Sequence, residues 1–413
     1  MRTPLLSLVL ATVTSAPVAL ATPPASAADD IGTTPARSPA QLVAADEERV
    51  SHRGLERGPE ASPHPAMPAP IATEPPGDWW VLHAGVRPRL GTFGGIAALG
   101  LAHERIERFY GVLSLSLIRN DAGTHYGGVQ LALGRNLSDD FGGIAQIGVG
   151  ENRARSFAGV GQLALAYNRT LDTAAVFQVA GYNRARDFAG ALQLGGYNRT
   201  DDAFVGALQL GGFNHSRGDF TGIGQLGVVN AQGQDPFDFD LRGDARFAGL
   251  VQLGAVNSAG RFRGLVQAGV SSFSHDFAGG LQLGVMGAGA AEFRGLAQVG
   301  LLAMAGRSYG AQIGAAAVAL DSHRGLQLGL AANYAESVHG AQIGIANIAS
   351  EARGVQIGLF NHARRLRGVQ IGLVNYAEDG VLPWTAIINM GFGDEPSSDP
   401  GNYARTARAA HDG

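Results

Sequence analysis

Residues 354–361 read GVQIGLFN, and 14 residues further on residues 368–375 read GVQIGLVN. In both copies Val, Ile and Leu alternate with Gln and Gly. An apolar residue at every second position over five to eight residues indicates a β-strand, whereas a helix would place its apolar residues three to four positions apart. Charged and turn-forming residues, such as 362–365 (HARR), separate one copy from the next. The chain is therefore predicted to consist of tandem strand units.

A central Gln marks these units along most of the chain. Successive Gln residues are 14 to 16 positions apart, with one spacing of 27. Two earlier units carry Ser114 and Ala98 in the same position, which brings the number of units to eighteen. We interpret the Gln row as a structural feature of one strand face, and its members are Gln130, Gln146, Gln162, Gln178, Gln193, Gln209, Gln225, Gln252, Gln267, Gln282, Gln298, Gln312, Gln327, Gln342, Gln356 and Gln370.

A small residue follows each Gln at a distance of two positions. It is Gly in thirteen of the sixteen units and Ala in the other three. A strand residue that must be small implies that neighbouring strands approach closely on that face. We therefore expect Gly358→Leu to be more damaging than Gln356→Leu, because Gln is assigned to a face that is partly wet.

Two all-β architectures fit this pattern, and the first is an antiparallel meander closed as a transmembrane β-barrel. Strands of about 9–11 residues cross a bilayer when tilted. Eighteen units and two flanking strands, at 79–86 and 384–392, give about twenty strands, and bacterial barrels have an even number. Val, Ile and Leu would face lipid, while Gln, Gly and Ala would line the lumen. The Phe found five positions before the central residue in eleven units would lie near the rims.

The alternative architecture is a β-solenoid with one coil of 14–16 residues per unit. A solenoid needs a second inward-facing segment in each coil to close its core. The return half of the unit, such as 361–366 (NHARRL), is short and charged. For this reason we favour the barrel.

The ends of the chain differ from the repeat. Residues 1–27 are predicted to be a signal peptide, since Arg2 precedes an apolar stretch that ends in Ala25-Ser26-Ala27. Residues 28–77 are a Pro/Ala-rich segment predicted to be disordered, as is the tail 394–413, and 78–393 form the β-repeat domain. The expected location is the outer membrane or cell surface of a Gram-negative bacterium.

Composition and motifs argue against catalysis and against binding of metals, cofactors or nucleic acid. Gly accounts for 61 of 413 residues, Cys is absent, and the net charge is −4 without any basic segment that would suggest nucleic acid as a partner. The eleven His residues are scattered, and no nucleophile, phosphate-loop or metal motif is present. We therefore expect no enzymatic activity, no cofactor, no metal and no small-molecule ligand. Outer-membrane lipid is the expected partner, and a host or envelope protein partner stays unspecified.

The spacing of 27 between Gln225 and Gln252 contains an insertion that we consider as a metal site. Residues 231–246 carry four carboxylates, which could bind Ca²⁺, or the loop could fold inward as a constriction, but the carboxylate spacing departs from that of an EF-hand. We interpret the segment as a solvated acidic loop, and its carboxylates are Asp235, Asp238, Asp240 and Asp244.

The units at 354–361 and 368–375 resemble the short repeats of a bacterial surface-repeat family first named from spirochaete proteins. The resemblance is closest over 338–377 and weakens toward the N-terminus. It implies export and a surface or outer-membrane location, and it brings no catalytic residues. We therefore expect an exported outer-membrane or cell-surface β-repeat protein with a structural or weakly selective pore role. The alternative is a secreted or surface-attached β-solenoid that serves as an adhesin or spacer.

Overall fold

The structure, a computed structural model, describes residues 81–233 and 244–392. The chain divides into two units, Met1–Ala72 and Thr73–Gly413, and every described residue belongs to the second. The predictions for the signal peptide, the Pro/Ala-rich segment and the C-terminal tail fall outside the described residues.

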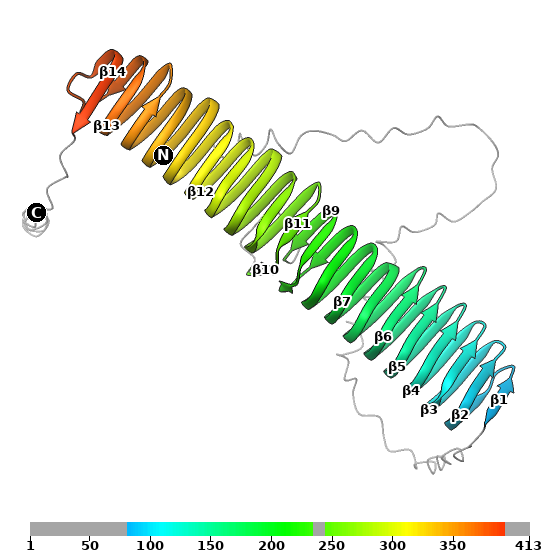
Figure 1. The fold of residues 1–413 in the computed structure, drawn as a ribbon. Coiled ribbons are helices and arrows are strands. Elements are labelled where there is room, and N and C mark those ends of the chain that lie inside the picture. The colour runs from blue at the N-terminus through cyan, green and yellow to red at the C-terminus, as the bar shows by residue number, and fades with distance from the viewer. Residues whose placement is uncertain (1–80, 234–243, 393–413) are drawn as a thin grey trace, which may run out of the picture. The chain divides into compact units, whose positions relative to one another are not determined.

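The described residues form a single sheet of fourteen strands. β7 and β12 are long because each continues through several coils without interruption (Figure 1). In chain order the strands are β1 (Leu82–Gly85), β2 (Arg89–Gly100), β3 (His103–Ser116), β4 (Arg119–Ala132), β5 (Arg135–Gly148), β6 (Glu151–Ala164), β7 (Tyr167–Ser216), β8 (Phe220–Thr221), β9 (Gly224–Gln232), β10 (Arg246–Ala248), β11 (Val251–Leu253), β12 (Val256–Ile357), β13 (Phe360–Ala377) and β14 (Trp384–Phe392).

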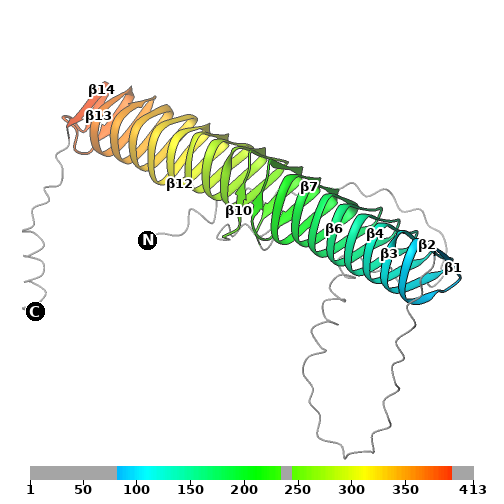
Figure 2. The ribbon, with the colours of Figure 1, turned by 60° about the horizontal axis from the view of Figure 1, so that its bottom comes forward.

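Neighbouring coils pair in parallel, with equivalent repeat positions opposite one another. Phe93 of β2 lies opposite Phe109 of β3, and Gln130 of β4 lies opposite Gln146 of β5. Each repeat is therefore one turn of a solenoid, stacked on the turn before it (Figure 2). The chain forms a parallel β-solenoid of about 18 turns, with coils of about 16 residues.

The prediction of an antiparallel barrel of about twenty strands is therefore wrong, and so is the outer-membrane pore that depended on it. The argument against a solenoid failed at the return half of the coil. Within 361–366 the residues Asn361, Ala363 and Leu366 are buried, while the charged residues between them point outward. A narrow core needs only these small or medium side chains, so a short and charged return segment is sufficient to close it.

The glutamine row lies inside the solenoid and not on the wall of a lumen. Each of the sixteen side chains is at most 1% exposed. The amide nitrogen of each Gln from 146 onward donates to the amide oxygen of the preceding Gln, over 2.6–3.1 Å. Fifteen hydrogen bonds thus link all sixteen residues into one glutamine ladder, and the buried amides are satisfied by each other.

The aliphatic residues beside each Gln point outward. Ile357 is 40% exposed and Leu373 is 66% exposed. The sequence therefore predicted the alternation correctly but assigned the polar residues to the wrong environment. The interior contains amides, and much of the exterior is apolar.

Two further columns fill the core. The Phe column packs ring on ring, with centroids 4.8–5.3 Å apart between Phe residues, and the imidazole of His125 takes one position in the stack. The second column is an asparagine ladder, in which each side chain donates to the next Asn over 2.7–3.0 Å. It runs from Asn136 to Asn257 and again from Asn333 to Asn375.

The later coils turn their corner differently. In the coils up to Phe293, the buried residue lies five positions before Gln, and an aliphatic residue such as Leu265 or Leu296 stands exposed two positions before Gln. In the coils after Phe293, the buried residue that replaces Phe in the core lies four positions before Gln, as Val338 and Leu366 do. The corner residue two before Gln is now Gly with a positive φ, at Gly310, Gly325, Gly340, Gly354 and Gly368.

The 231–246 insertion leaves the stack uninterrupted. β9 ends at Gln232 and β10 begins at Arg246, both within this segment, yet Gln252 donates to Gln225 over 3.1 Å and Asn230 donates to Asn257 over 2.9 Å. The C-terminal end is different, because β14 pairs antiparallel with β13. There the Asn389 side chain donates to Gln370 over 3.4 Å, in place of a further Gln.

Candidate functional site

The carboxylates of the predicted acidic loop do not form a site within the described residues. Asp235, Asp238 and Asp240 lie outside the described residues. Asp244 is described, and its carboxylate is 3.4 Å from the Arg261 guanidinium. Within 81–233 and 244–392 no group of His, Asp and Glu side chains could hold a metal ion.

A charged hollow of about 810 Å³ runs along the outer surface of the coils from β3 to β7. Its floor follows a buried column that includes Ala154, and the side chains on either side of that column, such as Arg153 and Arg155, form its walls. Its charged lining consists of Arg105, Arg119, Arg153, Arg155, Arg169, Arg184, Glu107, Asp121, Asp139 and Asp201. Six arginines against four carboxylates give the hollow a formal charge of +2, whereas the whole chain carries −4.

The arginines form a column because each follows a ladder asparagine. Arg153 lies opposite Arg169 in the parallel register of β6 and β7. Arg184 and Arg199 follow Asn183 and Asn198, whose side chains are bonded to each other over 2.9 Å. We call Arg153, Arg169, Arg184 and Arg199 the arginine column. Neighbouring backbones in a sheet are about 4.8 Å apart, so the four guanidinium groups are attached at intervals of that size.

A single carboxylate, Asp201, pairs with the two arginines at the C-terminal end of the column. Asp201 lies 2.9 Å from Arg184 and 2.7 Å from Arg199. Burial acts to raise the pKa of Asp201, but hydrogen bonds from Arg199 and Arg184 outweigh that effect and hold the pKa below its usual value. Asp201 is therefore ionised and forms a fixed part of this end.

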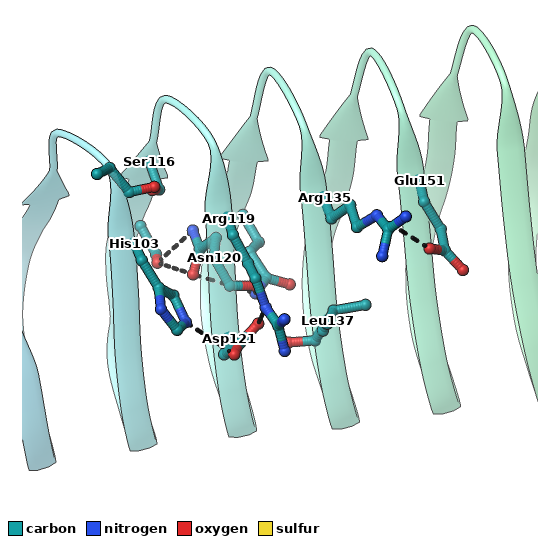
Figure 3. A network of polar contacts seen from close by, with 11 residues as sticks. His103, Ser116, Arg119, Asn120, Asp121, Arg135, Leu137 and Glu151 are labelled. Atoms are coloured by element: carbon teal, nitrogen blue, oxygen red, sulfur yellow. Dashed lines mark hydrogen bonds and ion pairs between the residues drawn. The ribbon is translucent and has the colours of Figure 1, made fainter. Parts of the chain in front are cut away.

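A second carboxylate serves the other end of the hollow. Figure 3 shows Asp121 between His103 and Arg119, at 2.9 Å and 2.7 Å respectively. One coil further on, Arg135 is 3.7 Å from Glu151. The middle differs, since neither Arg153 nor Arg169 makes an ion pair within the described part of the chain. Two cations thus face each other in register without a carboxylate between them.

An aromatic column runs beside the arginines. Tyr167, Tyr182 and Tyr197 each precede a ladder asparagine, so they lie on the same outward face as the arginine that follows it. The rings of Tyr182 and Tyr197 are stacked with centroids 5.2 Å apart, and those of Tyr167 and Tyr182 meet edge-on at 5.9 Å. Partial burial raises the pKa of Tyr182 and Tyr197, so their hydroxyls stay protonated.

Two buried titratable residues occupy core columns near the hollow. Glu104 stands one coil before Asn120, where an asparagine would be expected, and neither carboxyl oxygen has a hydrogen-bond partner. Burial raises its pKa to about 8. His125 is stacked between Phe109 and Phe141, and burial lowers its pKa to about 4. Both side chains are uncharged in the core at neutral pH.

The opposite end of the solenoid carries an apolar groove of about 670 Å³. Its walls are the outward aliphatic residues of the last coils, among them Leu330, Ile345, Leu359 and Leu373. None of its lining residues is charged.

Sequence reasoning missed the arginine column. We assigned the charges between units to turns, although the Asn-Arg pair recurs at 152–153, 168–169, 183–184 and 198–199. That recurrence was the available signal. It becomes informative only when the coils are stacked in parallel, because an antiparallel meander would place these residues at alternating rims.

Comparison with known proteins adds no assignment: no family model, no curated protein and no solved structure matches the chain. No helix among the described residues is long and apolar enough to cross a membrane.

Proposed function

We propose that the chain is an exported surface β-solenoid without enzymatic activity, which acts as a stiff spacer and adhesin. The glutamine ladder is the observation that carries this proposal. It ties every coil from Gln130 to Gln370 to its neighbour through buried hydrogen bonds. Such a ladder serves no reaction, and it gives the stack a continuous internal support.

Stacked coils suit a spacer because each adds a fixed rise. Coils separated by about 4.8 Å give eighteen turns a length on the order of 80 Å. The outer surface then presents equivalent residues at equal intervals, as in the arginine column. A repeated surface of this kind fits a binding role better than a catalytic one, which needs different groups brought to one point.

Export is supported by the sequence alone. Residues 1–27 have the features of a signal peptide, and the repeats at 354–361 and 368–375 resemble those of the surface-repeat family. We therefore place the chain at the cell surface or in the medium.

Small-angle scattering of the purified full chain, combined with surface labelling of cells that express it, tests the proposal. We expect a rod-like particle that is recovered without detergent, and a chain that antibodies reach on intact cells. A compact particle that needs detergent, or a chain retained in the cytoplasm, would refute it.

A further inference from the structure

We propose that the arginine column and the neighbouring tyrosines form a binding face for a linear acidic polysaccharide. This inference rests on the proposed adhesin function and specifies its ligand. The polymer lies along the stack of coils, with its carboxylate or sulfate groups on the guanidinium groups and its hydroxyls on the phenols.

The positive charges of Arg153 and Arg169, unpaired among the described residues and placed in the middle coils of the hollow, favour the binding of an anion. Like charges directly opposite each other in a sheet destabilise it, and Arg153 and Arg169 are such a pair. Carboxylates are available in the chain, and Asp121 and Asp201 form ion pairs with arginines at the two ends of the hollow. A ligand anion at Arg153 and Arg169 would remove the remaining repulsion, and a guanidinium group can bind a carboxylate or sulfate through two parallel hydrogen bonds.

The spacing of the column selects a polymer over a small anion. The glutamine and asparagine ladders fix the backbone of every coil from 152 to 198. Four arginines at steps of about 4.8 Å span about 14 Å. Among the described residues they share one carboxylate, Asp201, so four arginines against one carboxylate leave three positive charges along the column. A small anion would meet one or two of them, whereas a chain with acidic groups along its length meets several at once and gains affinity from each added contact.

The tyrosines select a hydroxyl-rich ligand over a nucleic acid. Proteins that bind single-stranded nucleic acids leave aromatic faces open for bases to stack on. Here the faces of Tyr182 and Tyr197 cover each other at 5.2 Å. The Tyr197 hydroxyl is 3.2 Å from Nδ1 of buried His215, so of this pair it is Tyr182 that presents its edge and hydroxyl to a ligand. The charges of Arg199, Arg184 and Arg169 all act on Tyr182, which places the phenol close to the cations.

Binding of polygalacturonate fragments to the full chain at low salt tests this assignment, with neutral dextran as the reference polymer. We expect polygalacturonate to bind and dextran not to bind. The double variant Arg153→Gln/Arg169→Gln should weaken binding at least tenfold, and Tyr182→Phe should weaken it severalfold while the ring stays in place. Raising the salt concentration should weaken binding further, because the contacts are ionic.

The control is Arg353→Gln/Arg364→Gln, which removes two exposed arginines from coils outside the hollow. An equal loss of binding in the control, or no binding of polygalacturonate to the parent chain, would overturn the proposal. Tighter binding of a single-stranded oligonucleotide than of polygalacturonate would overturn the ligand class. Scattering and circular dichroism of each variant show whether it folds, so a failed ligand is distinguishable from a failed solenoid.

Discussion

The coils before and after residue 300 differ in the side chains that fill the core and in the residue at the corner. Those from Phe93 to Phe293 fill the core with stacked rings except at Thr173, and most of them expose a large aliphatic residue at the corner. Those from Ser308 to Ala377 have a core of Ala, Val and Leu, with a left-handed Gly at the corner. We refer to them as the Phe-lined coils and the Gly-corner coils.

The glutamine ladder crosses the boundary between the two regions without a break. Gln312 donates to Gln298 over 2.8 Å, as in the coils on either side. The difference is that the later coils have one residue fewer between the core position and Gln. A left-handed Gly turns the chain in a shorter path, and the core position holds Ser308, His323, Val338, Ala352 and Leu366 in place of the Phe stack. The amide ladder therefore sets the register, while the other columns fill the volume that the corner leaves.

The largest effect is expected from the Phe column. Phe262→Ala removes a ring that is fully buried and stacked on Phe247 and Phe277, which should cost about 3–5 kcal/mol. The matched change in the Gly-corner coils is Phe360→Ala, where the ring is exposed and the cost should be about 0.5 kcal/mol or less. Hydrogen exchange measured coil by coil gives both values. Similar costs at the two positions would mean that the ring stack contributes nothing special.

The next effect concerns the corner. Gly340→Val places a branched side chain at a φ of +137°, and its Cβ would lie 2.0 Å from the Gly325 carbonyl oxygen. The left-handed conformation and the overpacking together should cost about 2–5 kcal/mol. The reverse change in a Phe-lined coil, Leu265→Gly, should cost only about 1 kcal/mol. Urea denaturation of both variants measures the difference, which should vanish if the two corners are alike.

The amide ladder should respond less strongly. Gln356→Leu leaves the Gln342 oxygen without its donor, while the Gln370 nitrogen loses one acceptor and keeps the Tyr376 carbonyl as the other. Each unsatisfied buried group costs about 1–3 kcal/mol, so the change is not the mild one expected for a partly wet face.

Gly358→Leu should still be the more damaging substitution of the two. Its Cβ would lie 2.3 Å from the Gly344 oxygen, which is backbone and cannot move aside. Thermal unfolding of both variants tests this order, and a lower stability of the Gln356→Leu protein would contradict it.

The most local effect is a pH dependence confined to the first Phe-lined coils. A Glu in an unfolded chain ionises near pH 4.3, but buried Glu104 keeps its proton up to about pH 8. Its folded pKa is raised, so stability is greatest below pH 4.3 and falls as the pH rises toward 8. Glu104→Gln removes this loss.

The difference in hydrogen exchange between Glu104→Gln and the parent chain should therefore grow from pH 5 to pH 8 near β3. In the Gly-corner coils we expect no such difference. There burial lowers the pKa of His323 to about 4, so that residue destabilises its coil in acid and not in alkali. A constant difference across this pH range would show that Glu104 is ionised in the folded chain.

The repeat, the strands and the need for a small residue after Gln could all be predicted from the sequence. Alternation fixes which residues share a face, but it is the same for a parallel stack and for an antiparallel meander. Their difference lies in register: only a parallel stack places Gln130 opposite Gln146 and Phe93 opposite Phe109. Identical residues at a constant interval, including a Phe five positions before Gln, were the indication of that register.

The interior was assigned wrongly because hydrophobicity was used to choose it. An isolated Gln is costly to bury, and Val, Ile and Leu are the usual core residues. A ladder removes that cost, since each amide meets an identical one in the next coil. The arginine column was also missed because, like the ladder, it arises only when equivalent residues of neighbouring coils are stacked.

The reversed strand at the C-terminus has a consequence for polymerisation. In amyloid fibrils, copies of one segment add in parallel and in register, and amide ladders hold them together. This solenoid contains such a ladder within one chain, so an open end would be a template for a second molecule. β14 runs against β13, and the side chain of Asn389 takes the acceptor of Gln370 that the next Gln would have used. Because β14 is antiparallel, it prevents a second molecule from adding in parallel and in register at this end of the stack.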